Sequence, residues 1–215
     1  MRLTQPSEAG DRLEQIGLLP YSVLLDSLTA GQQILATCTL DDPASARGVY
    51  VWGTITKTTR QLGRSFGWER CDTGNLSTVL SPDQRLQIMV ATGDEATGMV
   101  GVTPRTKYPR GAASIRAIND NQMALPTLER FFIKKQSVER PAGVLTWIFL
   151  HRRLRDSVKW ELSLPKMVGA DGIIMEWEER IIFEPVSFDA IDENLLGNDF
   201  DHDGDDFDPT VTRKR

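Results

Sequence analysis

The sequence predicts an α+β fold, in which an antiparallel β-meander near the C-terminus packs against helices from the N-terminal and central parts. Three observations support this prediction. Apolar residues recur at helical spacing within residues 11–64. Three strand-like segments follow within residues 144–183, the second and third of which alternate apolar and polar side chains, and the apolar pattern fades before residue 189. We therefore expect one α+β domain over residues 1–188, with helices covering one face of the meander, and an acidic, largely disordered tail over residues 189–215.

The N-terminal part contains the first predicted helices. A short helix fits residues 11–16 and is ended by Gly17. A second begins at Pro20, which suits a first helical position, and its apolar spacing continues as far as Gly31. Residues 44–64 are ambiguous, because their β-branched residues favour a strand while the spacing of their apolar residues favours one helical face; here we favour the helix.

The middle of the chain is predicted to hold two short strands, an irregular segment and a helix. The strands cover residues 75–80 and 86–92 and are joined by a Ser-Pro-Asp turn. Residues 93–111 contain two prolines and several glycines, which argue against regular structure there. A helix with a modest apolar face then follows over residues 112–123.

Three consecutive strands give the clearest pattern, over residues 144–150, 158–164 and 173–183. In the second strand, apolar residues alternate with Lys159 and Glu161, and this period of two indicates one buried and one solvent-facing side. Short connections between the strands favour an antiparallel meander. We expect aromatic side chains from these strands to dominate the core: Trp147, Phe149, Trp160, Trp177 and Phe183.

The composition is that of an ordinary globular domain. Of 215 residues, 40% are apolar and 26% are charged. No apolar run approaches the roughly 20 residues of a membrane span, and the polar start lacks the apolar stretch of a secretory signal. The two cysteines have no metal-ligand or redox spacing, which fits a reducing compartment. We therefore expect a cytoplasmic protein with no membrane association and no cofactor.

The net charge of −5 is unevenly distributed along the chain. Residues 189–215 hold nine carboxylates and three basic residues, whereas residues 1–188 hold 21 acids and 22 bases. The tail is therefore strongly acidic and the body is nearly neutral. A neutral body argues against nucleic-acid binding over the whole surface, but it leaves room for a local basic patch.

One stretch of the tail is similar to the first half of an EF-hand calcium loop, because carboxylates occupy alternate positions before Gly204. The weak metal candidates are Asp199, Asp201, Asp203 and Asp205. The twelfth position of such a loop is Thr210, which cannot supply the bidentate carboxylate that closes the calcium cage. We therefore assign no metal site.

The tail also mixes acidic residues with apolar ones, which is the composition of a segment that docks on a basic groove and becomes ordered on binding. The candidate partner-binding residues are Phe200, Phe207, Asp205 and Asp206. The partner could be another macromolecule or the protein's own basic residues. The competing interpretation is a solvated tail that only improves solubility.

Two basic clusters are candidates for contact with phosphate or nucleic acid. The first leads into the N-terminus of the predicted helix at residues 112–123, where backbone N–H groups favour anions, and consists of Arg105, Lys107 and Arg110. The second occupies the connection between the first two meander strands and consists of Arg152, Arg153 and Arg155. Lys159 and Lys166 could extend it. The competing interpretations are, for the first cluster, a solvated loop or cations neutralised by the preceding Asp94 and Glu95, and for the second, a charged sheet edge that prevents aggregation.

Two functions of different classes fit these features. The favoured one is a non-catalytic binding or accessory protein that engages a protein partner, or nucleic acid, through its basic patches and acidic tail. The alternative is a metal-dependent hydrolase or nuclease that collects a divalent ion with Glu161, Glu176 and Glu178, which requires these carboxylates to converge. No established catalytic motif is present, so no catalytic residue is assigned and enzymatic activity is left open.

Overall fold

The computed structural model describes residues 1–39, 41–72, 76–131 and 143–188. In these ranges the α-helices span Ala9–Ile16 (α1), Tyr21–Gln33 (α2), Ala44–Gly63 (α3) and Ala112–Phe131 (α4). The strands span Arg2–Thr4 (β1), Glu69–Cys71 (β2), Thr78–Leu80 (β3), Leu86–Thr92 (β4), Leu145–Arg153 (β5), Ser157–Val168 (β6), Ile174–Ile182 (β7) and Val186–Ser187 (β8). The predicted α+β class is confirmed, and so is the helix at residues 44–63.

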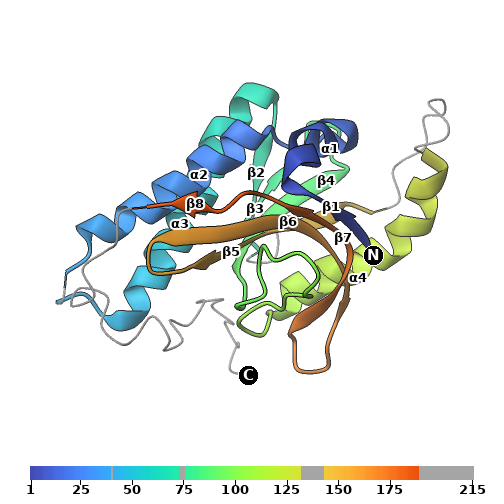
Figure 1. The fold of residues 1–215 in the computed structure, drawn as a ribbon. Helices are drawn as coiled ribbons and strands as arrows, with labels where there is room; N and C mark the ends of the chain where they lie inside the picture. The colour runs from blue at the N-terminus through green and yellow to red at the C-terminus, as the bar shows by residue number, and fades with distance from the viewer. Residues whose placement is uncertain (40, 73–75, 132–142, 189–215) are drawn as a thin grey trace, which may run out of the picture.

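The strands form one mixed sheet in the order β1–β7–β6–β5–β4–β3–β2, and β8 pairs with β6 (Figure 1). Strands β5, β6 and β7 are antiparallel neighbours, which confirms the meander. Strands β4 and β5 are parallel. Parallel neighbours need a long crossover connection, and α4 is part of that connection here. The short strand β1 adds parallel to β7 and was not predicted.

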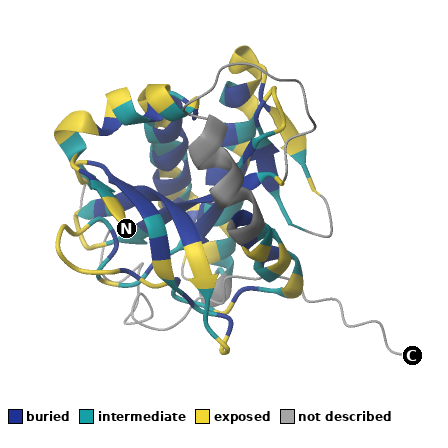
Figure 2. Ribbon diagram, turned by 90° about the vertical axis from the view of Figure 1, so that its right-hand side faces the viewer, coloured by how far each residue is buried: buried dark blue, intermediate teal, exposed yellow. Residues whose placement is uncertain are grey.

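Helices α1, α2 and α3 contribute to the larger core, on one face of the sheet. Most of the sheet is buried, as the dark blue strands in Figure 2 show. Here Trp160 stacks on Phe183 with ring centroids 4.1 Å apart, and its indole N–H donates to the carbonyl of Glu184 over 2.8 Å. Helices α2 and α3 approach closely at Gly31, where a Cβ atom would lie only 2.2 Å from Cγ1 of Ile55. All five aromatic residues predicted for the core are buried.

Helix α4 and residues 93–111 lie against the other face of the sheet, so the helices cover both faces rather than the predicted one. Ile118 of α4 packs on apolar side chains of β4 and β5. The fully buried Asn121 binds the backbone of Thr146 twice: its Nδ2 donates to the carbonyl over 3.0 Å, and its Oδ1 accepts from the amide over 2.7 Å. This pair of bonds fixes the crossover helix on the sheet.

The polar face predicted for the meander is largely buried as well. Glu161 and Ser163 of β6 are 0% exposed and Arg180 of β7 is 1% exposed, because residues 93–111 cover them. The alternation of side chains was predicted correctly, but the solvent-facing interpretation of that side was wrong at these positions. None of the helices in the described ranges has the length and apolar content needed to cross a membrane.

Candidate binding surface

A buried ion pair in the sheet holds residues 93–111. Arg180 of β7 donates from Nε and Nη2 to the two carboxylate oxygens of Glu161 on β6, over 3.0 and 2.6 Å. Ser163 Oγ donates to the same carboxylate over 2.7 Å, and the backbone N–H of Gly98 does so over 2.8 Å. The carboxylate therefore has four donors, as a buried charge requires.

The guanidinium of Arg180 also binds the irregular segment directly. It donates to the carbonyls of Val102 and Met99 over 2.7 and 3.2 Å. The indole N–H of Trp177 donates to the carbonyl of Pro104 over 2.8 Å. Because this segment lacks a regular hydrogen-bond ladder, such side-chain bonds satisfy its backbone and fix its course.

Bonds from the sheet to the turn at residues 98–102 leave three apolar side chains in solvent. Met99, Val100 and Val102 are 37%, 49% and 46% exposed, and we call them the apolar tip. At Gly98 the backbone has φ of +68°, and a Cβ atom would lie 3.0 Å from the amide nitrogen of Trp160, so this approach needs glycine. Isolated exposed apolar residues are common, but here three lie within four positions on an anchored turn, which makes the turn a candidate contact surface.

Two cations lie beside this turn on the sheet. Arg152 of β5 and Lys159 of β6 are direct cross-strand partners, so their side chains share one face, the face that carries Glu161. A Cβ atom at Gly98 would lie 3.1 Å from Cβ of Lys159, which places Lys159 next to the apolar tip. Both side chains are half-buried.

A third cation comes from the irregular segment itself. Arg105 is exposed, and its carbonyl accepts a hydrogen bond from the amide of Asp94 over 3.0 Å. The preceding residue, Gly93, donates to the carbonyl of His151 over 3.0 Å, one position before Arg152. Arg105 therefore belongs to the same end of the sheet, and we call Arg105, Arg152 and Lys159 the cationic rim.

The rim cations lack acidic partners: among the described residues, no ion pair involves any of them. Like charges on directly opposed strand positions destabilise a sheet, so the facing of Arg152 and Lys159 opposes folding. An external anion bound between Arg152 and Lys159 would relieve this repulsion, so the pair is a candidate anion contact.

The other two cations of the first predicted cluster are Lys107 and Arg110. Arg110 is only 8% exposed. Its Nε donates to the carbonyl of Tyr108 over 3.4 Å, and its amide donates to the carbonyl of Gly172 over 2.8 Å. Lys107 is half-buried, with Nζ 5.4 Å from the centre of the Tyr108 ring. Neither side chain is presented to solvent as Arg105 is.

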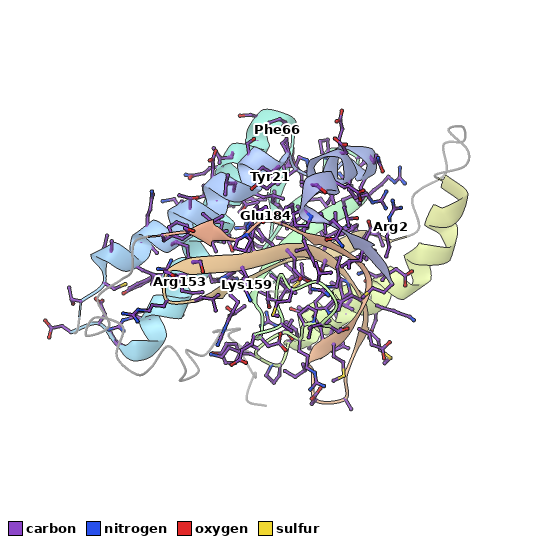
Figure 3. The ribbon with its side chains drawn as sticks, in the orientation of Figure 1. Arg2, Tyr21, Phe66, Arg153, Lys159 and Glu184 are labelled. Atoms are coloured by element: carbon purple, nitrogen blue, oxygen red, sulfur yellow. The ribbon has the colours of Figure 1, made fainter. Side chains whose placement is uncertain are left out.

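Within the second predicted cluster the sheet separates neighbouring arginines. Arg153, which is labelled in Figure 3, pairs with Val158, so it points to the face opposite Arg152. Its guanidinium lies 5.3 Å from the centre of the Phe188 ring. Burial lowers the pKa of Arg153 below its usual value, while the nearby carboxylate of Asp156 acts in the opposite direction. Arg155 is exposed in the turn.

The three carboxylates of the hydrolase alternative are not brought together. Glu161 is buried and bound to Arg180, whereas Glu176 is exposed and pairs with Met167 toward the far end of the β6–β7 ladder. Glu178 is half-buried. In the part of the chain that the structure describes, no three potential metal ligands form a group.

The predicted tail sites, both the metal candidates and the partner-binding residues, lie outside the described residues: Asp199, Phe200, Asp201, Asp203, Asp205, Asp206 and Phe207. The described chain ends at Phe188, whose amide donates to the carbonyl of Asp156 over 2.8 Å. Strand β8 pairs with the start of β6, so the chain reaches residue 189 beside the β5–β6 turn.

Sequence reasoning missed the apolar tip and the role of Arg180. The available signal was the pair Gly98 and Gly101 around two apolar residues within an otherwise polar loop. Nothing local could identify the partner of Arg180, because Glu161 lies on another strand.

We compared the chain with protein-family models, curated proteins and solved structures, and none of the three comparisons gives a match. Function must therefore be inferred from the residues described above.

Proposed function

We propose that this protein is a non-catalytic binding or accessory protein that engages an anionic macromolecule through the apolar tip and the cationic rim. The observation that carries this proposal is that three cations without acidic partners in the described chain lie at one end of the sheet, beside a turn that exposes three apolar side chains. A cytoplasmic location, expected from the cysteine content, belongs to the same proposal.

Protein interfaces commonly combine an apolar centre with a polar rim, and the tip and rim have these two parts. The cations would speed the encounter with an acidic surface, while the apolar side chains would add contact area once docked. The turn is already bonded to Arg180 and Glu161, so little conformational freedom is lost when it binds. An acidic protein segment is favoured over nucleic acid, because contacts to a phosphate backbone are made by charged and polar groups and would leave the apolar tip unused.

The test is fluorescence anisotropy of the full chain with two labelled probes of equal negative charge. One probe is a peptide of alternating glutamate and phenylalanine, and the other is a single-stranded DNA. We expect the peptide to bind more tightly. For the DNA, three contacts predict a slope of log affinity against log salt of about −2, since each contact contributes roughly 0.7 on single strands.

Variants distinguish the contributions of the cationic rim and the apolar tip to probe affinity from the effect of the overall charge. Arg152→Gln combined with Lys159→Gln should weaken both probes, and Met99→Ser should weaken the peptide alone. Lys57→Gln combined with Arg64→Gln is the matched control, because both residues are exposed, on α3 and directly after it, and α3 packs on the opposite face of the sheet. If the control lowers affinity as much as the rim variant, the binding is diffuse and the proposal fails.

A further inference from the structure

The binding surface combines two chemistries that a ligand would have to match. Its cations call for carboxylates or phosphates, and its exposed Met99, Val100 and Val102 call for apolar side chains. A ligand that matches both is an acidic segment with a few apolar anchors. This description narrows the partner class of the proposed function, on which the inference rests.

This protein contains one such segment in its own sequence. Residues 189–215 carry nine carboxylates. Apolar anchors are interspersed with these acids: Leu195, Leu196, Phe200 and Phe207. The charge of this segment is opposite to that of the cationic rim, and its anchors match the apolar tip.

The structure fixes where this segment begins. Phe188 is bonded through its amide to Asp156 in the β5–β6 turn, and its ring lies under the guanidinium of Arg153. The β5–β6 hairpin that ends in this turn also carries Arg152 and Lys159. The described chain therefore ends at the hairpin that carries two of the three rim cations, with Phe188 on the face opposite Arg152 and Lys159.

We infer that the apolar tip and the cationic rim form a docking surface whose occupant is residues 189–215 of the same chain. The tether makes the contact intramolecular, with an effective concentration of about 1 mM for a short flexible connection. With a dissociation constant on the order of 1 mM, the segment would occupy the surface about half of the time. With one on the order of 0.1 mM, it would occupy the surface most of the time. It would weaken the binding of an external partner about two- to tenfold.

The test uses the full chain with its methionine methyl groups labelled with ¹³C for NMR. Met99 reports on the tip, and its resonance is assigned with Met99→Leu. Met167 is the matched control, because it is similarly exposed, at 43%, near the opposite end of β6 from Lys159. The tail variant replaces the six aspartates at Asp199, Asp201, Asp203, Asp205, Asp206 and Asp208 by asparagine.

We expect the Met99 methyl resonance to move in the tail variant and at high salt, while that of Met167 stays in place. Phe200→Ser combined with Phe207→Ser should move Met99 in the same direction. A synthetic peptide of residues 189–215, added to the tail variant, should return Met99 toward its wild-type position. If the Met99 resonance stays in place in every tail variant, the inference is overturned. If the difference in the Met99 resonance between wild type and tail variant disappears on dilution, the contact is made with a second copy of the chain. That result would also overturn the inference.

Probe binding distinguishes failure of this inference from failure of the proposed function. If both hold, the glutamate–phenylalanine peptide binds the tail variant two- to tenfold more tightly than it binds the wild type. If Met99 responds to the tail but no probe binds either protein, the intramolecular contact stands without the proposed function. If both proteins bind the peptide equally and Met99 does not respond, the proposed function stands and the tail is not the occupant.

Discussion

Replacing Glu161 by Gln should destabilise the protein strongly, because it leaves the charge of Arg180 in the interior without a counter-charge. Glu161 and Arg180 are 0% and 1% exposed. The neutral amide keeps one oxygen as an acceptor but turns an N–H toward donors of Arg180, Ser163 or Gly98. Removing one partner of a buried pair costs about 3–5 kcal/mol, a large share of the 5–15 kcal/mol that stabilises a typical domain.

Urea denaturation followed by tryptophan fluorescence measures this loss. With a slope of about 2 kcal/mol per molar urea, the midpoint should fall by roughly 2 M. Hydrogen exchange should also accelerate at the amide of Gly98, which loses its acceptor in Glu161. Glu176→Gln is the control, because this exposed carboxylate of β7 should change stability by no more than about 0.5 kcal/mol.

A double variant tests the cause of the loss. Glu161→Leu combined with Arg180→Met removes both charges and keeps apolar volume, so it should be more stable than Glu161→Gln. The carbonyls of Met99 and Val102 would lose their donor in this variant, which limits the recovery. A loss below about 1 kcal/mol in Glu161→Gln would refute the reasoning, because it would mean that water reaches Arg180 or that the pair contributes little.

Two further predictions concern the aromatic cluster. Trp160→Ala should cost about 3–5 kcal/mol in the same denaturation assay, because the side chain is fully buried on Phe183, and an unchanged midpoint would contradict its place in the core. Burial and, secondarily, the carboxylate of Glu184 raise the pKa of Tyr21 (both are labelled in Figure 3), so its contribution to stability is intact below the unfolded-state pKa and is lost as pH rises through the folded-state pKa. Glu184→Gln should lower that pKa in an absorbance titration that uses Tyr21→Phe as the blank, and no change would exclude the charge effect.

Periodicity predicted the elements whose burial follows a simple pattern. Alternation around Trp160 and Trp177 identified β6 and β7, and apolar spacing around Ile55 favoured the helix over the strand at residues 44–63. In these cases the apolar side chains recur with the period of the element, so the local sequence contains the information. The parallel pairing of β4 and β5 was less accessible, because it depends on how α4 returns the chain to the sheet.

The binding surface was only partly predictable, because its geometry depends on residues distant in sequence. Arg105, Arg152 and Lys159 were identified as basic, but their grouping depends on the β5–β6 register and on the Gly98 contact. Arg153 looked equivalent to Arg152, yet strand alternation sends it to the other face. Glu161 and Arg180 resembled a solvated face because a pattern of alternating polarity does not show what covers it.

The buried ion pair and the exposed tip are best understood together. Burying Glu161 and Arg180 is costly, and a well-packed apolar pair would often serve stability equally well. What an apolar pair cannot do is donate hydrogen bonds to the carbonyls of Met99 and Val102 and accept one from Gly98. The pair therefore positions an irregular turn with the precision of regular structure. The side chains held this way point into solvent, so this precision adds nothing to the core, and under the proposed function it would serve contact with another segment.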